Sequence, residues 1–214
     1  MESFKNIKYQ TKELQSKISA NTALELLING NKRFVDKKFS KKDYFLQISK
    51  STSGQYPFAI ILSCIDSRVP PEIIFDKGIG DIFSVRVAGN VVSSDVLGSI
   101  EYACKYAGVK LILVLGHTSC GAVKGACDNL KDGNLSGLLE KIDPAVKITK
   151  TDSNEKRNSS NIEFVNKVAE NNTKISIDNI LAKSSILKKL YNSKNIKIKR
   201  AIYDVNNGKV SLLN

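Results

Sequence analysis

The amino-acid sequence predicts an α/β fold with a mostly parallel central β-sheet, made of four parallel strands plus a C-terminal edge strand and flanked by helices. Three features predict it: short apolar runs, helical patterns between them, and a hairpin signal near the end of the chain. Strands are predicted at residues 56–63, 82–87, 111–115 and 196–205, and the first is apolar on both faces, as expected in the middle of a parallel sheet. An Asn207–Gly208 turn then indicates a hairpin.

The chain before the first strand is predicted to begin with an N-terminal helical arm over residues 1–38. Apolar residues with the spacing of an amphipathic helix run from Ala20 to Phe34, and Asn21 is a residue type that favours a helix start. Residues 40–56 are polar and lack a helical period, so we expect an irregular segment there.

Helical patterns also lie between the strands. Proline suits the first turn of a helix, so Pro70–Pro71 predicts a short helix after the first strand. Gly89 closes the second strand, and a crossover helix is predicted over residues 94–106, with Gly108 as its C-cap. Another helix is expected over residues 121–130.

The C-terminal third contains one polar stretch without periodicity, residues 150–160, which we interpret as an exposed loop rather than a domain linker. Two helical patterns follow it, at residues 162–170 and 176–191. At 214 residues the chain is long enough for one sizeable core, so we expect a single domain over residues 1–214.

Composition narrows the class of protein. The net charge of +12 comes from lysines dispersed along the chain, a pattern that argues against nucleic acid as a partner. The first twenty residues have no apolar core of a secretory signal, and no run of 18 apolar residues occurs, so we expect a cytoplasmic protein without a membrane partner. Cysteines stay reduced in that compartment, so disulfides are not expected among the four cysteines.

Three potential metal ligands follow strand ends. Cys64 comes directly after the first strand, His117 follows the third, and Cys120 is three residues further on. Carboxyl ends of parallel strands share one edge of the sheet, and two thiolates with one imidazole suit Zn²⁺ with an open fourth position. Packing roles for His117 and Cys120 remain the alternative, and Cys104 and Cys127 lie on apolar helix stripes that favour packing.

Asp66 and Arg68 follow Cys64 closely and have two interpretations. As a surface ion pair they would contribute little to stability. Beside a metal, Asp66 can take the open coordination position, or it can accept a hydrogen bond from the metal's water while the guanidinium of Arg68 holds it away.

Taken together, these segments resemble the β-class carbonic anhydrases. The resemblance covers most of the chain except the first residues and the 150–160 loop. It rests on CIDSR (64–68) and GHTSCGAVKGA (116–126), supported by ALELLINGNKRFV (23–35), VRVAGNVV (85–92), GSIEYA (98–103), SSILKKL (184–190) and IKRAIYDVNNGKV (198–210).

The resemblance implies zinc-dependent, reversible hydration of CO₂ to bicarbonate and a proton, by attack of zinc-bound hydroxide. It implies one Zn²⁺ per subunit and an Asp–Arg dyad that orients the hydroxide. The residues at the matching positions are Cys64, His117 and Cys120 as zinc ligands, Asp66 and Arg68 as the catalytic dyad, and Gln55, Phe83, Tyr102 and Gly121 around the substrate.

The resemblance further implies a homodimer, or a dimer of dimers, with the N-terminal helix laid across the partner. Some members have a regulatory bicarbonate site built on a tryptophan, and this sequence has no Trp. We therefore expect Asp66 to pair with Arg68 rather than with the metal.

Three other functions compete with CO₂ hydration. A zinc-binding or sensing domain without catalysis would keep the three ligands, and hydrolysis of another small heterocumulene such as CS₂ could use the same residues. A thiol redox enzyme is disfavoured because the sequence has no C-x-x-C motif.

Overall fold

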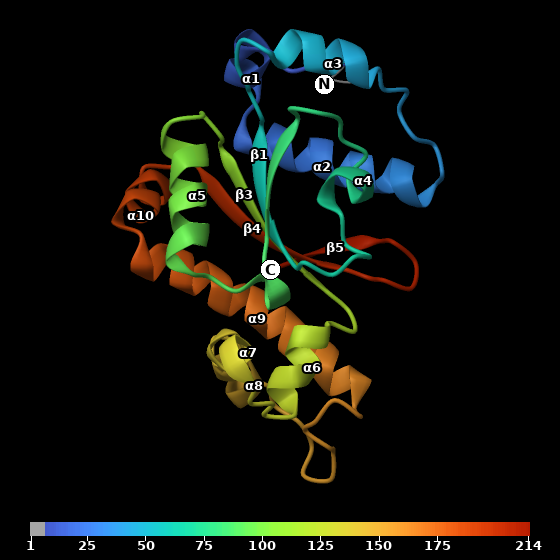
Figure 1. Cartoon of the computed structure of the whole chain (residues 1–214), viewed down its shortest axis with the longest axis vertical. Helices are drawn as coiled ribbons and strands as arrows, with labels where there is room; N and C mark the ends of the chain where they lie inside the picture. The colour runs from blue at the N-terminus through green and yellow to red at the C-terminus, as the bar shows by residue number, and fades with distance from the viewer. Residues whose placement is uncertain (1–6) are drawn as a thin grey trace.

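The computed structural model describes residues 7–214, and its centre is one five-stranded sheet in the order β2-β1-β3-β4-β5 (Figure 1). The first four strands along the chain run parallel and β5 pairs antiparallel with β4. The predicted fold class is therefore confirmed. The strands are β1 (Ala59–Ser63), β2 (Ile82–Arg86), β3 (Leu111–His117), β4 (Lys197–Tyr203) and β5 (Val210–Leu213).

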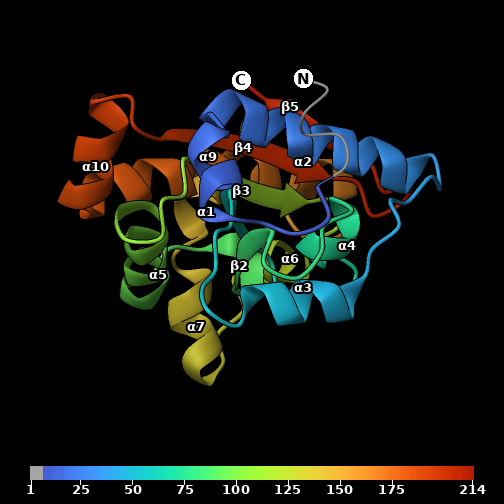
Figure 2. The same cartoon turned by 90° about the horizontal axis from the view of Figure 1, so that it is seen from above.

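Helices cover both faces of the sheet (Figures 1 and 2). One core cluster packs α2 and α4 on one face, and a second packs α5, α9 and α10 on the other. The helices are α1 (Lys12–Lys17), α2 (Ala20–Val35), α3 (Tyr44–Ser51), α4 (Pro71–Ile74), α5 (Ser94–Lys105), α6 (Gly121–Cys127), α7 (Gly133–Leu139), α8 (Asp143–Ile148), α9 (Ile162–Lys183) and α10 (Ser185–Asn192), with a short 3₁₀ turn η2 (Ala88–Asn90).

The two central strands, β1 and β3, end at the edge of the sheet where the candidate metal ligands lie. Every residue of β1 and β3 is buried, because each strand has neighbours on both sides and helices on both faces. Ser63 pairs with Leu115 across the β1–β3 ladder, so the two strands reach the same edge together. Cys64 and His117 therefore lie at the same edge of the sheet.

Two predictions for the N-terminal region were wrong. The N-cap of α2 is Ser19, whose hydroxyl accepts from the Thr22 amide, so Asn21 already lies inside the helix. Residues 40–56 contain the helix α3, which begins at an Asp43 cap. Buried Gln47 ties α3 to the chain by accepting from the Ile79 amide, a long-range contact that no local period reveals.

The helices after β2 also differ from the prediction at several points. The helix α5 has Tyr106 as its C-cap, and Gly108 lies two residues beyond with a φ of 79°. The predicted pair of helices at 162–170 and 176–191 is instead one 22-residue helix, α9, followed by α10. Two further helices, α7 and α8, were not predicted, and α6 ends at Cys127.

The N-terminal arm packs on its own chain. Gln15 of α1 donates to the carbonyls of Pro57 and Ala107, and Lys110 donates to those of Ser16 and Ile18. Residues 150–160 form a largely exposed loop. The assignment of residues 1–214 to one domain stays a prediction.

No helix within residues 7–214 combines the length and the apolar character needed to cross a membrane. The cytoplasmic location stays a prediction.

Candidate metal centre

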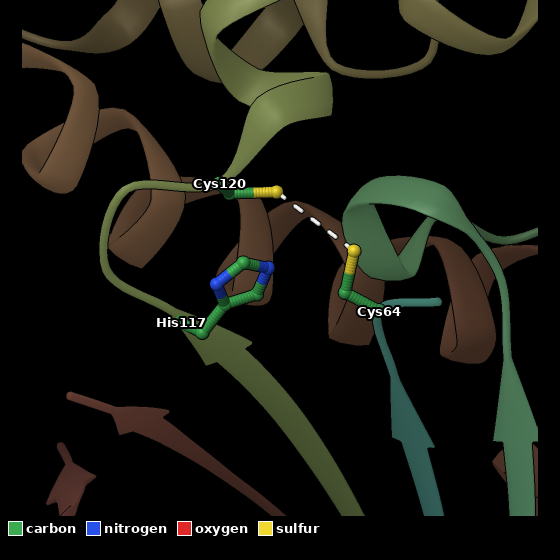
Figure 3. Close-up of side chains that lie close together, drawn as sticks. All are labelled: Cys64, His117 and Cys120. Atoms are coloured by element: carbon green, nitrogen blue, oxygen red, sulfur yellow. Dashed lines mark hydrogen bonds between the residues drawn. The ribbon is translucent and has the colours of Figure 1, made fainter. Parts of the chain in front are cut away.

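Cys64, His117 and Cys120 converge at the carboxyl edge of the sheet (Figure 3). Their ligand atoms all lie within 4.8 Å of one another, and all three residues are buried. Figure 3 shows the two sulfur atoms turned toward each other beside the imidazole ring, with Cys64 arriving from β1 and His117 from β3. The trio predicted from the sequence is thus brought together by the fold.

The backbone between His117 and Cys120 turns sharply. Ser119 adopts a left-handed conformation with φ 57°, and its amide donates to Oδ1 of Asn166. Cys120 then occupies the N-cap of α6, where the backbone amides of Ala122 and Val123 act to lower the pKa of its thiol. A helix N-terminus favours negative charge, so this position suits a thiolate.

His117 is held in one orientation and one tautomer. Its Nδ1 lies 2.9 Å from the carbonyl oxygen of Thr118, so Nδ1–H donates and Nε2 keeps its lone pair. Nε2 is fully buried and has no hydrogen-bond partner among the described residues. A buried imidazole nitrogen without a hydrogen-bond partner costs free energy. A metal ion bound to Nε2 would remove this cost.

The separation of the two sulfurs fits a tetrahedral zinc site. The Sγ atoms of Cys64 and Cys120 are 3.9 Å apart. Two Zn–S bonds of 2.3 Å at a tetrahedral angle place sulfurs about 3.8 Å apart. The donor set and its spacing therefore fit Zn²⁺ held by Cys64, His117 and Cys120, with room for a fourth ligand.

The two thiol groups are hydrogen-bonded to each other. The hydrogen bond with Cys120 lowers the pKa of the Cys64 thiol, while the same bond raises the pKa of Cys120 by holding its proton. Gly89 also donates its amide to the Cys64 sulfur, at 3.3 Å. A divalent cation can replace the proton held by Cys120 and let both thiols ionise.

Asp66 and Arg68 form a bidentate pair at the mouth of this centre. Nε and Nη2 of Arg68 donate to the two carboxylate oxygens of Asp66 at 2.9 and 2.8 Å, and the Arg68 amide donates at 3.0 Å. Oδ2 of Asp66 lies 3.9 Å from Nε2 of His117. The side chains are 16% and 51% exposed, so the pair borders both the buried ligands and solvent.

The guanidinium beside it holds the pKa of the Asp66 carboxyl well below its usual range. Asp66 therefore stays ionised at about pH 4, where an ordinary aspartate is already about half protonated. A fixed carboxylate beside a buried metal position can accept a hydrogen bond from a water molecule there.

The sequence matches the model of the carbonic anhydrase family over residues 59–210. That range contains the Cys/His/Cys trio and the Asp66–Arg68 pair. The chain belongs to the β-carbonic anhydrase family.

Curated relatives and solved structures agree with this assignment. The chain is 45% identical over 136 residues to carbonic anhydrase 2 of Mycobacterium tuberculosis, covering 61% of this chain and 66% of that protein. It is 44% identical over 130 residues to the carbonic anhydrase of Mycolicibacterium smegmatis, covering 58% and 63%. The chain thus spans just under two thirds of the length of these relatives.

The β-carbonic anhydrase CafA of Aspergillus fumigatus superposes with a TM-score of 0.69 at 27% identity, over 78% of this chain and 80% of that one. The Coccomyxa β-carbonic anhydrase, solved with acetazolamide, superposes with a TM-score of 0.69 at 24% identity, over 89% and 86%. The second likeness shows the fold alone.

Three of the four predicted substrate residues, Gln55, Phe83 and Tyr102, do not join the metal centre of their own chain. Phe83 and Tyr102 lie together, with ring centroids 6.4 Å apart, in a surface groove of about 680 Å³. Phe83 pairs with Ile60, so it lies four positions, or roughly 13 Å, short of Cys64 along the sheet. Gln55 is exposed before β1, at the opposite end of the strand.

Gly121 behaves differently, because it follows Cys120 directly. It is exposed, and a side chain placed there would meet no atom within 4 Å. Open space therefore borders the metal centre at this residue.

The remaining two cysteines lie outside the trio. Burial raises the pKa of the Cys104 thiol to about 12 and that of Cys127 to about 11. Cys104 packs in the core on the α5 face of the sheet, and neither residue is part of the metal-ligand group. Their predicted packing roles agree with this placement.

Two residues that organise the centre were not predicted from the sequence. Arg86 donates to the carbonyls of Cys64 and Asp66 and so fixes the loop between them. Gly89, predicted only to close a strand, adopts φ 64° and binds the Cys64 sulfur through its amide. A glycine just after a predicted strand was the one available signal, since these contacts join residues that are 20 to 25 positions apart.

Proposed function

We propose that this protein catalyses the reversible, zinc-dependent hydration of CO₂ to bicarbonate and a proton. Membership of the carbonic anhydrase family supports the reaction class. The observation that carries the proposal is the Asp66–Arg68 pair beside the buried Cys64/His117/Cys120 trio. A metal site that only stabilised the fold would be closed by a fourth protein ligand and would not need this pair.

Each group has a distinct role in this proposal. Cys64, His117 and Cys120 would hold one Zn²⁺ per subunit, which would supply an acidified water molecule for attack on CO₂ near neutral pH. Asp66 would accept a hydrogen bond from that water at Oδ2, the oxygen nearest His117. Arg68 occupies both carboxylate oxygens and keeps Asp66 from acting as a fourth ligand.

Access for a small apolar substrate is available on the solvent side. Gly121 leaves open space beside Cys120, and Val87 packs against the cluster that contains both ligand cysteines. An apolar wall with few polar groups suits CO₂. Asp66, which is partly exposed, lies at this entrance.

We further propose that the active form is a homodimer or a dimer of dimers. The support is the separation of Gln55, Phe83 and Tyr102 from the metal centre of the same chain. In a two-fold symmetric dimer, the groove of one copy can complete the centre of the other. The fold is shared with β-carbonic anhydrases of Sordaria macrospora that are described as tetrameric.

Stopped-flow CO₂ hydration, paired with metal analysis, tests the proposal. The purified full-length protein should contain one zinc per chain and hydrate CO₂, and removal of zinc by dipicolinate should abolish the activity. Readdition of Zn²⁺ should restore it. Zinc without turnover would instead favour a binding or sensing domain, and turnover of CS₂ without CO₂ hydration would favour the heterocumulene hydrolase.

A further inference from the structure

The helix α9 carries three polar side chains that bind backbone next to the candidate metal centre, in the 89–90 turn that contacts Cys64 and in the loop between His117 and Cys120. Nδ2 of Asn172 donates to the carbonyl of Gly89 at 2.7 Å, and the Ser176 hydroxyl donates to the carbonyl of Asn90 at 2.9 Å. Asn166 accepts from the Ser119 amide at 2.9 Å. The roles derived above for the metal centre use none of these three residues.

Each of these bonds falls on backbone in the left-handed conformation. Gly89 has φ 64°, Asn90 has φ 44° and Ser119 has φ 57°. For a residue other than glycine this conformation costs free energy, and it persists only where surrounding contacts enforce it. Two adjacent left-handed residues at 89–90 thus need the anchors that α9 supplies.

Packing around the 89–90 turn leaves little freedom. A side chain on Gly89 would come within 2.6 Å of Cδ1 of Ile142, so this N-cap residue of α8 packs against the other side of the turn. Asn172 and Ser176 are 1% and 2% exposed, and buried polar groups are costly unless they bond. The hydrogen bonds from Asn172 and Ser176 therefore restrict the position of the 89–90 turn.

The turn matters because Gly89 is bonded on both sides. Its carbonyl is held by Asn172, and its amide donates to the Cys64 sulfur at 3.3 Å. A hydrogen bond to a thiolate withdraws charge from the sulfur and tunes the metal that the sulfur holds. We infer that Asn172 and Ser176 are positioning residues. They hold the Gly89 N–H in hydrogen-bonding contact with the Cys64 sulfur and so affect how tightly the site binds a metal ion. This inference rests on the metal-binding role proposed above.

The test compares two neighbouring asparagines on the same helix in the full-length protein. Asn172→Leu removes the donor to Gly89. Asn171→Leu instead removes a donor to the Thr149 hydroxyl, which lies outside both the 89–90 turn and the loop between His117 and Cys120. Chelator competition measures zinc affinity, and Co²⁺-loaded protein reports the energy of its sulfur-to-cobalt charge-transfer band. Neither readout depends on turnover.

We expect Asn172→Leu to weaken zinc binding by about 10- to 100-fold, the usual effect of losing a group that orients a metal ligand. Its cobalt band should move to longer wavelength, because a thiolate with a weaker hydrogen bond gives up charge more easily. Asn171→Leu should leave both readouts at the wild-type values. Ser176→Ala, a smaller truncation that is better tolerated, should shift both in the same direction as Asn172→Leu.

Wild-type affinity and band position in Asn172→Leu, or in Ser176→Ala if the first variant fails to fold, would overturn the inference. Equal shifts in Asn171→Leu would overturn it too, because the effect would then be general loosening of α9. Failure of the wild-type protein to bind either metal would overturn the proposed metal centre itself, and this inference with it.

Discussion

Asp66 is the residue whose chemistry separates a catalytic centre from a plain metal site. Asp66→Asn keeps the size of the side chain and removes its charge, so we expect zinc content to stay at the wild-type value. The rate constant kcat/KM for CO₂ hydration should fall by roughly 10²–10⁴-fold, the range typical of losing a positioned acid–base group. Stopped-flow kinetics and metal analysis on the same preparation measure both.

Cys64→Ser provides the contrasting variant, because it removes a ligand rather than the pair beside it. It should lose zinc and activity together. Full CO₂ hydration by Asp66→Asn would remove Asp66 from the mechanism. The low pKa of Asp66 also means that wild-type activity changes between pH 6 and 9 do not arise from protonation of this carboxyl, which is charged throughout.

The convergence of the candidate metal ligands could be predicted from the sequence because strand ends in a parallel sheet coincide. The register that pairs Ser63 with Leu115 delivers Cys64 and His117 to one edge, as alternation of strands and helices implies. The contact of Gly89 with Cys64 could not be predicted. It depends on Asn172, more than 80 residues later in the chain, and on a left-handed backbone that strand and helix periods do not encode.

At the scale of helices, prediction succeeded where the buried face is apolar and failed where it is polar. The helix α3 exposes Phe45 at 85% and buries Gln47, so apolar side chains face solvent and the buried face is polar. The middle of α9 buries Asn172 and Ser176 for the same kind of reason, since they bond to other backbone segments. Tertiary hydrogen bonds, absent from local sequence, stabilise both helices.

Close packing between helices gives the same substitution opposite effects at two glycines. Gly30 lies inside α2, where a Cβ would stand 1.8 Å from the carbonyl oxygen of Phe75. Gly30→Ala should therefore lower the free energy of unfolding by roughly 1–3 kcal/mol, the cost of forcing a packed contact apart. Urea unfolding followed by circular dichroism measures the change.

Gly137→Ala is the matched control, because Gly137 lies inside α7 and a Cβ there meets no atom within 4 Å. In open space alanine favours a helix, so the free energy of unfolding should rise by about 0.5–1 kcal/mol. Equal effects of the two substitutions would mean that helix propensity, and not the contact with Phe75, governs position 30.

At the scale of the whole molecule, the separation between the metal centre and the Phe83–Tyr102 groove predicts complementation between chains. One chain carries Asp66→Ala, and the other carries Gln55→Ala together with Phe83→Ala; each is inactive or nearly so alone. Co-expression with two affinity tags isolates the mixed dimer. One of its two centres then combines unaltered groups from both chains, so about half of the wild-type activity per dimer should return.

The control combines two chains that are altered in the same centre, Asp66→Ala and Arg68→Ala. Because these two residues pair within one chain, every centre of the mixed dimer lacks one of them and activity should stay absent. A dimer of dimers would lower the restored fraction of the first pair but keep it above this control. Equal, negligible activity of both pairs would mean that Gln55 and Phe83 do not serve the partner's centre, and the groove would need another role.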